Sequence, residues 1–352
     1  MLGHPSPPQY WRTRVCFKRC LAFIYAVGFF IIIKQYLPLL GQDGILPIQS
    51  FLERSSFLKS PSLFWLDASD TFILILGWLG LALAGLAISG LADAANNIIS
   101  GVVWGLLWFI YLSFVSVGQT FYGFGWESIL LETGFLAIFL GCAKSKPPAL
   151  VIWLLRWVLF RVMFGAGLIK IRGDACWRDL TCMIYHYETQ PVPNPLSWFF
   201  HHLPVWFHKL EILFTHFVEL IVPWAYFLMR PVVWIAGGLT FFFQATLILS
   251  GNLSWLNFMT LVLCIPCFDD RLLSGLRGGG IPKSIPTSWI RNACLISLAC
   301  LIGFLSIFPV TNMISSRQIM NRRFDPFHIV NTYGAFGSIT KVRREIIIEG
   351  TD

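Results

Sequence analysis

The sequence predicts an all-α polytopic membrane bundle of about nine transmembrane helices, followed by the start of a β domain. Of its 352 residues, 56% are hydrophobic and only 12% are charged, and they include 32 Phe and 15 Trp. Apolar runs close to the ~20 residues that cross ~30 Å of hydrocarbon recur along most of the chain. This composition excludes a water-soluble globular domain.

Nine apolar runs are predicted as membrane helices. In chain order they cover residues 16–40, 71–91, 98–117, 128–143, 150–171, 204–228, 232–250, 254–267 and 289–310. The fourth and eighth are short, so they are tilted into the bundle, re-entrant, or completed by neighbouring residues. The first run follows basic residues, as in a signal peptide, but it is too long and lacks a small-residue cleavage site, so it is retained as a membrane helix.

Basic residues in short loops predict the orientation, because such residues collect on the cytoplasmic side. Those predicted to lie inside are Arg12, Arg14, Lys18, Arg19, Lys144, Lys146, Arg230 and the basic residues of the 271–283 loop. The N-terminus is then cytoplasmic, and the loops 41–70, 121–127 and 172–203 face outward together with the C-terminal tail. Three arginines in the tail, Arg317, Arg322 and Arg323, argue against its outward position.

The longest outward loop, 172–203, holds most of the polar residues outside the apolar runs. Its candidate outward-loop residues are Tyr185, His186, Tyr187, Glu188, Pro191, Pro193, Pro195, His201 and His202. Prolines at alternate positions preclude a helix there and favour a stiff, extended path. Cys176 and Cys182 share this loop and form a disulfide if that side of the membrane is oxidising.

Ionisable residues inside or at the edge of the apolar runs are predicted to gather in one buried group, here called the polar seam. An ionisable side chain costs roughly 2.5–3.5 kcal/mol at the bilayer centre, so it is expected there only with a partner or a function. The seam comprises Glu127, Glu132, Arg156, Arg161, Lys170, His208, Lys209, Glu211, His216 and Glu219. One interpretation is structural ion pairing of Glu132 or Glu219 with Arg156 or Arg161. The other is a catalytic cavity that opens outward, with Lys170 as base and His186, Glu188 and Glu132 as helpers.

Other functional classes receive little support from the sequence. The His201–His202 pair lacks the further Cys, His or carboxylate pattern of a metal centre, so no metal and no cofactor are predicted. The net charge of +8 is explained by Lys and Arg flanking the membrane helices, so no nucleic acid partner is predicted. Membrane lipids are expected as neighbours.

The tail changes its pattern after the last apolar run. Residues 328–330 and 345–349 are predicted as strands, and residues 331–337 as a turn-rich connection between them. Two strands alone are marginal in water. The predicted division is therefore a transmembrane domain over 1–316 and, over 317–352, the first strands of an outward-facing β domain that is cut short.

Six segments of the chain resemble the lipase maturation factor family. They are GQDGILP from Gly41, GWESILLETGFLAIFL from Gly125, RWVLFRVMFGAGLIK from Arg156, YHYETQPVPNPLSWFFHHLPVWFHKL from Tyr185, GNLSWLNFMTLVL from Gly251 and HIVNTYGAFGSITKVRREIIIEG from His328. The resemblance implies a multi-pass endoplasmic reticulum protein, with a lumenal C-terminus, that assists the folding and assembly of secreted lipases as clients. It implies no catalytic activity. In a bacterium the membrane would be the inner one.

A shorter segment, FGAGLIKIRGDACW from Phe164, is distantly similar to the vitamin K-dependent carboxylase family. Lys170 falls where that family has its catalytic lysine, although Ile169 replaces a second lysine. The similarity implies a shared ancestral membrane fold. It also defines the alternative function, a membrane enzyme with Lys170 as base at the outward face.

Overall fold

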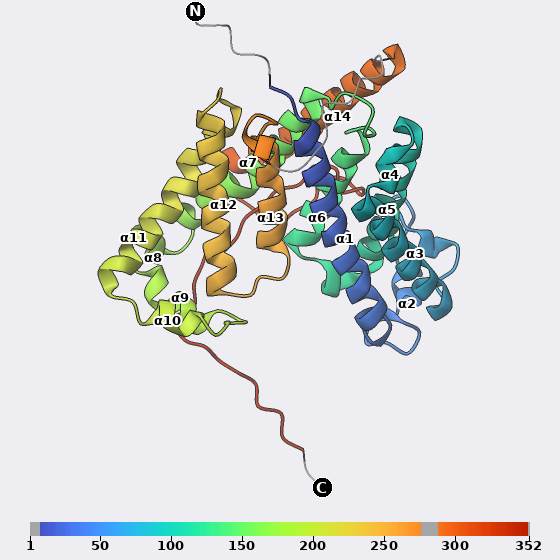
Figure 1. The fold of residues 1–352 in the computed structure, drawn as a ribbon. Helices are drawn as coiled ribbons and strands as arrows, with labels where there is room; N and C mark the ends of the chain where they lie inside the picture. Colours follow the sequence, from blue (N-terminus) through green and yellow to red (C-terminus); the bar gives the residue numbers. More distant parts are fainter. Residues whose placement is uncertain (1–7, 276–287, 351–352) are drawn as a thin grey trace, which may run out of the picture.

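The structure is a computed structural model that describes residues 8–275 and 288–350 (Figure 1). Residues 276–287, which include Lys283 of the predicted basic loop, lie outside the described part. The helices at the two ends of the chain are α1 (Trp11–Leu40) and α14 (Trp289–Ile314). No strand occurs in the part of the chain that the structure describes.

Seven helices are long and apolar enough to cross a membrane. They are α1, α3 (Asp70–Ser89), α5 (Asn97–Val117), α7 (Ala149–Arg172), Val205–Phe227, α12 (Val232–Ser250) and α14. The fifth of these is composite: α11 (Val205–His216) continues through a π turn, Phe217–Ile221, and a 3-10 turn, Val222–Phe227. A mostly helical, multi-pass membrane chain is therefore confirmed.

The count of nine spanning helices is not confirmed. The predicted runs 128–143 and 254–267 correspond to α6 (Gly125–Ile138) and α13 (Leu256–Cys264), which have 14 and 9 residues. At 1.5 Å per residue, α6 reaches about 21 Å, less than the ~30 Å of hydrocarbon. Both short helices pack inside the bundle, α6 against α5 and α7 and α13 against α12 and α7.

Short helices gather at the end of the bundle from which the C-terminal tail leaves, here called the α9 end (Figure 1). They are α2 (Ile48–Leu52), α8 (Ala175–Arg178), α9 (Cys182–Thr189) and α10 (Ser197–His201). Residues 190–196, where the three alternate prolines lie, form no helix, as predicted, whereas the rest of loop 172–203 contains α8, α9 and α10.

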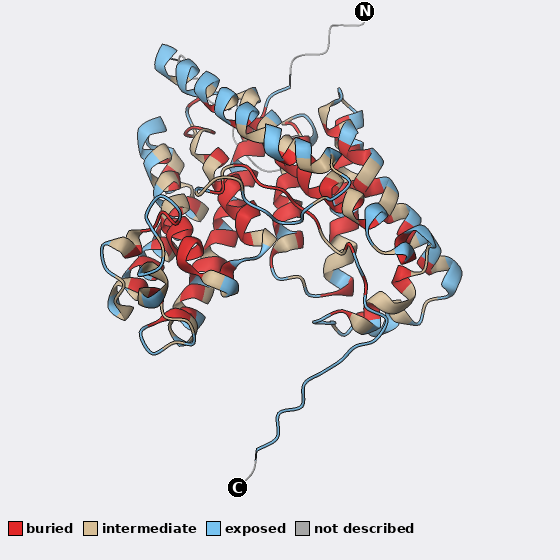
Figure 2. Ribbon diagram, turned by 180° about the vertical axis from the view of Figure 1, so that it is seen from behind, coloured by how far each residue is buried: buried red, intermediate tan, exposed pale blue. Residues whose placement is uncertain are grey.

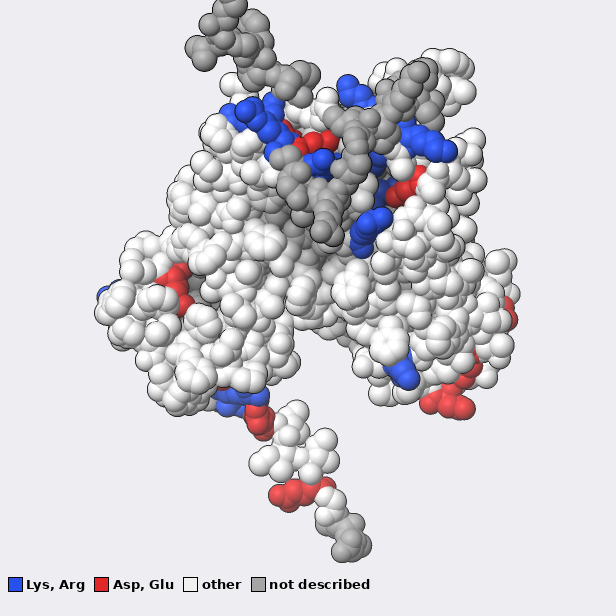
Figure 3. All heavy atoms as spheres, viewed as in Figure 1, with Lys and Arg blue, Asp and Glu red and all other residues white. Residues whose placement is uncertain are grey.

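The opposite end carries the N-terminus and most of the Lys and Arg residues visible in Figure 3. Two of the residues predicted to lie on the cytoplasmic side, Arg14 and Lys18, lie within α1 and are buried. Lys18 Nζ lies 2.5 Å from Asp93 Oδ1, an ion pair that the sequence analysis missed. These cations therefore hold α1 against the helices that follow it, in addition to lying at the basic end of the bundle.

The predicted β domain is not confirmed. Residues 328–330 are not a strand, because Asp325 caps this segment as a turn by accepting from the backbone N–H groups of Phe327 and Ile329. An isolated antiparallel bridge joins Arg323 and Asn331. Residues 345–349 are exposed and have no partner strand within the described residues. The tail is exposed or half-buried over residues 317–327, mostly buried over 328–339, and exposed where it leaves the bundle (Figure 2).

Close packing of α1 against α3 depends on a glycine in α3, Gly80. A Cβ at Gly80 would overlap the ring of Phe29. This ring is fully buried and contacts the rings of Tyr25, Tyr111 and Phe114, so it has no free space to enter. Gly85, on the same helix, has no atom within 4 Å of such a Cβ.

We predict that Gly80→Ala lowers the apparent unfolding temperature of the detergent-solubilised protein, since overpacking costs about 1–3 kcal/mol. The matched variant Gly85→Ala should leave that temperature unchanged or raise it slightly, because Ala is the better helix former. Thermal unfolding of the two proteins provides the comparison. Equal stability of both variants would show that α1 and α3 do not pack in this way.

Candidate functional site

A buried ion pair between Glu132 and Arg161 joins α6 to α7. The C-terminal segment adds further hydrogen bonds to this pair. Arg161 donates to the carbonyl oxygen of Asn331 at 2.7 Å, and Glu132 Oε2 accepts from the Tyr333 hydroxyl at 2.6 Å. The backbone N–H and side-chain amide of Asn331 also donate to Glu132, at 3.3 and 3.2 Å. Residues 331–333 therefore belong to the bundle core.

A second buried ion pair joins α7 to the π turn that follows α11. Lys170 Nζ donates to both carboxylate oxygens of Glu219, at 2.6 and 2.7 Å. The ammonium also lies 5.4 Å from the centre of the Trp177 ring. A π turn re-aims side chains within a helix and is frequent at functional sites. Here it places Glu219 where the carboxylate meets the end of Lys170.

This second pair lines a cavity of about 720 Å³. Its walls come from the start of α6, the second half of α7, helices α9, α12 and α13, and the C-terminal segment. Apolar lining residues include Trp126, Ile129, Val162, Met163, Ala166, Met183, Phe243 and Leu247, and polar ones include His186, Gln190, Gln244, Asn257 and Thr260. A large, mostly apolar cavity with a few convergent polar groups is the usual form of a small-molecule site.

His186 lines the same cavity as Lys170 and Glu219. Its burial, together with the nearby charge of Lys170, lowers the pKa of this imidazole to about 4. His186 is therefore uncharged at neutral pH. The cavity thus holds one cation, one anion and one neutral imidazole among its titratable groups.

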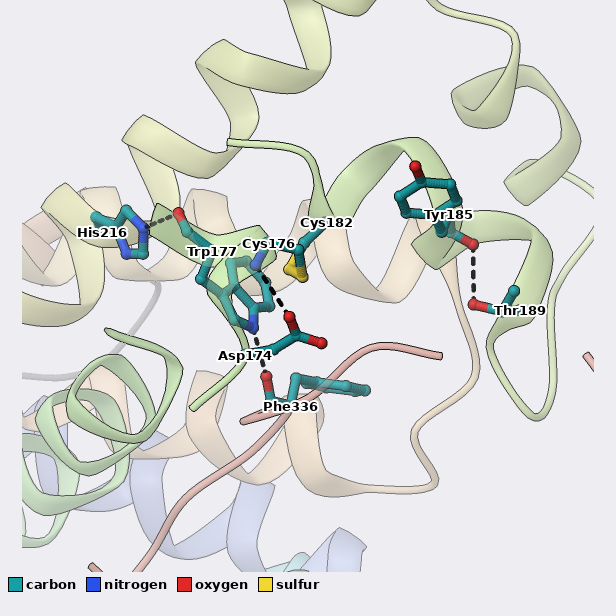
Figure 4. The surroundings of a disulfide bond; sticks show 8 residues. All are labelled: Asp174, Cys176, Trp177, Cys182, Tyr185, Thr189, His216 and Phe336. Atoms are coloured by element: carbon teal, nitrogen blue, oxygen red, sulfur yellow. Dashed lines mark hydrogen bonds between the residues drawn. A yellow bond between two sulfur atoms is a disulfide. The ribbon is translucent and has the colours of Figure 1, made fainter. Parts of the chain in front are cut away.

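A disulfide between Cys176 and Cys182 closes the loop beside this cavity (Figure 4). The Trp177 indole donates to the carbonyl oxygen of Phe336 at 2.8 Å, and His216 Nε2 lies 3.1 Å from the Trp177 carbonyl oxygen. The disulfide-bonded loop therefore contacts both the C-terminal segment and α11.

The aromatic and histidine residues of the outward loop mostly fix α9 against α11. The Tyr187 hydroxyl donates to Glu211 at 2.7 Å, and His208 Nδ1 lies 2.9 Å from the same carboxylate. His208 Nε2 lies 3.3 Å from the carbonyl oxygen of His201. The members of the loop that are exposed are Glu188, Pro191, Pro193, Pro195 and His202, while Tyr185 is half-buried.

The predicted polar seam is not continuous, because its members fall into separate groups. Arg156 pairs with no glutamate; it donates to the carbonyl oxygens of Pro266 and Tyr226 at 2.9–3.3 Å. Glu127 accepts from the Tyr111 hydroxyl at 2.5 Å. Lys209 is exposed, because it lies on the outer face of α11.

The alternative catalytic set is only partly assembled. Lys170 and His186 line the cavity, whereas Glu132 is engaged with Arg161 and is not among the lining residues. Glu188 is exposed and lies 3.6 Å from the ring of His201. Within residues 8–275 and 288–350, no three His, Cys, Asp or Glu side chains gather as a metal site requires.

Several residues of the site escaped the sequence analysis. Asn331 and Tyr333 were assigned to a turn outside the membrane, and Gln244 lies in an apolar run without a charge to draw attention to it. A polar side chain inside a membrane helix is the signal that would have pointed to Gln244. The tail residues show no pattern of hydrophobic residues that would indicate burial. Their partners are 199–201 positions away in the chain, so no local pattern indicates the contact.

We predict that Tyr333→Phe lowers the apparent unfolding temperature by a few degrees, since a hydrogen bond to a charged group contributes about 1.5–3 kcal/mol. Tyr185→Phe is the matched control, because that hydroxyl has no hydrogen-bond partner among the described residues. Thermal unfolding in lipid nanodiscs provides the measurement. An unchanged temperature for Tyr333→Phe would mean that Tyr333 does not complete the Glu132–Arg161 pair.

Comparison with known proteins places this architecture in a family. Residues 12–275 match the family model described as the lipase maturation factor transmembrane domain. Human lipase maturation factor 1 is 45% identical over 99% of this chain and 68% of its own length, and the bovine protein is 44% identical over 97% and 67%. Lipase maturation factor 2 of Xenopus tropicalis is 38% identical over 74% of this chain and 39% of its own length.

No solved structure matches the chain. This chain spans about two thirds of the length of the factor 1 relatives and less than half that of the factor 2 relatives. The match to the family model covers the helices that form both buried ion pairs and most of the cavity. The chain belongs to the lipase maturation factor family.

Proposed function

We propose that this chain is a membrane-embedded maturation factor that assists the folding and assembly of secreted lipases in the endoplasmic reticulum, without catalysing a reaction. The observation that carries this proposal is similarity along nearly the whole chain to proteins named lipase maturation factors. The clients are then secreted lipases, and the surrounding partners are membrane lipids.

The α9 end of the bundle is the lumenal side in this proposal, and the N-terminus is cytoplasmic. Two observations support this orientation. The Lys and Arg residues concentrate at the opposite end (Figure 3), as positive residues do on the cytoplasmic side. The Cys176–Cys182 disulfide lies at the α9 end, and disulfides persist in oxidising compartments such as the endoplasmic reticulum lumen.

Residues 1–316 serve as the transmembrane domain in this proposal, and residues 317–352 as its lumenal C-terminal segment. The relatives are longer than this chain. The segment after α14 packs beside Glu132 and Arg161 before leaving at the α9 end. Such an attachment would hold the residues that follow at a fixed distance from the membrane.

The arrangement of Lys170 favours a structural role over that of a catalytic base. A base must accept a proton, whereas the Lys170 ammonium donates two hydrogen bonds to Glu219. A buried ion pair can often be replaced by apolar residues of similar size at little cost. The paired substitution therefore separates the two candidate functions.

We predict that the chain restores secretion of active lipase when it is expressed in cells that lack their own lipase maturation factor. A protein with Lys170→Met and Glu219→Met together should retain most of this activity, because neither charge is left unpaired. Secreted lipase activity is measured per unit of lipase protein, with an unrelated secreted protein as control. Loss of all activity in a correctly folded double variant would favour the enzyme.

We predict that Glu53→Asn, which creates a glycosylation acceptor ending at Ser55 in loop 41–70, adds a glycan in mammalian cells. Pro282→Asn, which creates an acceptor ending at Ser284 on the opposite side, should not. Glycosidase-sensitive mobility on a gel detects the modification. A glycan on the Pro282→Asn protein alone would reverse the proposed orientation.

A further inference from the structure

The cavity described above changes character with depth. Ser250 ends α12 and Asn257 is the second residue of α13, so both lie at the α9 end, close to Gln190. Val162 and Met163 lie past the midpoint of α7, deeper in the bundle, and they line the cavity together with Ile129, Phe243 and Leu247. The cavity therefore combines polar groups near one end with an apolar interior.

A buried polar group in the wall has no partner. Gln244 is 5% exposed, and its Oε1 accepts no hydrogen bond from the described residues. Its Nε2 contacts only the sulfur of Met163, at 3.4 Å. Leaving such a group unsatisfied costs about 1–3 kcal/mol, which a ligand or an ordered water recovers. Asn257, which is 4% exposed, supplies a second amide to the same cavity.

The charges in the wall cancel. Lys170 and Glu219 neutralise each other at 2.6–2.7 Å, and His186 is uncharged at neutral pH because its burial lowers the pKa to about 4. An anionic head group would find no free cation among the lining residues, and a cationic one no free anion. Recognition is therefore left to the amide groups and to apolar contact.

From this combination we infer that the cavity binds an uncharged acyl amphiphile, with its hydroxyl group on Gln244 and its hydrocarbon chain extending from there along the apolar lining residues. The cavity volume of about 720 Å³ is within the range of roughly 300–1,000 Å³ that small-molecule sites occupy. A hydroxyl donates to Gln244 Oε1, the atom that lacks a partner. The inference does not depend on lipases being the clients.

Photolabelling of the purified full chain in detergent tests the inference. The probe is a 1-acylglycerol that carries a diazirine near the end of its acyl chain, and the labelled positions are found by mass spectrometry. We expect labels on lining residues of α6 and α7 away from Gln244, such as Ile129 and Ala166. Unlabelled 1-oleoylglycerol should suppress the labels at a concentration at least about tenfold lower than oleate does at pH 8. Oleate binds more weakly because the cavity offers no free cation to its carboxylate.

Two variants identify the site of binding. Ala166→Leu fills the cavity and should remove the labels, whereas Gly238→Leu, on a face of α12 with no atom within 4 Å, should leave them unchanged. Gln244→Leu should raise the concentration of 1-oleoylglycerol needed for suppression about fivefold, the factor for one hydrogen bond of ordinary strength. Unfolding temperatures of all variants show that each is folded.

Three results would overturn the inference. The first is suppression by oleate at the same concentration as by 1-oleoylglycerol. The second is labelling that persists in a folded Ala166→Leu protein. The third is labelling confined to the exposed apolar face of α14, which would mean that the probe meets only the outer surface of the bundle.

Discussion

The ion pair between Glu132 and Arg161 is the constraint on which the rest of the structure depends. Both side chains are fully buried between α6 and α7, where an unpaired charge would be strongly destabilising. The pair alone does not satisfy all of its hydrogen-bonding groups. Asn331 and Tyr333 supply further hydrogen bonds, so the C-terminal segment is held inside a helical bundle without forming a helix or a strand. Irregular backbone at this depth is tolerated because protein surrounds it.

The position of the tail also shapes the cavity. Gly165 of α7 and Gly173, which follows α7, lie so close to the carbonyl groups of Tyr333 and Gly337 that a Cβ would overlap them. The absence of side chains at these glycines lets the C-terminal segment approach α7, and residues 333–336 form part of the cavity wall together with α12 and α13. Trp177, in the disulfide-bonded loop, binds the same segment through Phe336 (Figure 4). One short stretch of chain therefore links the ion pair, the cavity and the α9 end.

Local sequence patterns predict the helices well and the tertiary partners poorly. All seven spanning helices were recognisable because an apolar run of sufficient length is a local property. The strand prediction for residues 328–330 was wrong because β-branched residues favour a strand only when a partner strand exists, and here the partners are helices. The importance of Glu132 and Arg161 could be predicted from the cost of buried charge. Of the alternative pairings predicted for Glu132 and Glu219 with Arg156 and Arg161, the structure has Glu132 with Arg161, while Arg156 donates to carbonyl oxygens at the 3-10 turns near Tyr226 and Pro266.

Hydrogen exchange of the backbone amides of residues 328–337 tests most directly whether the tail is part of the bundle. If Glu132 and Arg161 hold this segment, its amides exchange as slowly as those of α7, and Glu132→Gln accelerates them while the amides of α1 and α3 keep their rates. Exchange of residues 328–337 as fast as that of the exposed residues 341–350 in the unaltered protein would contradict the account.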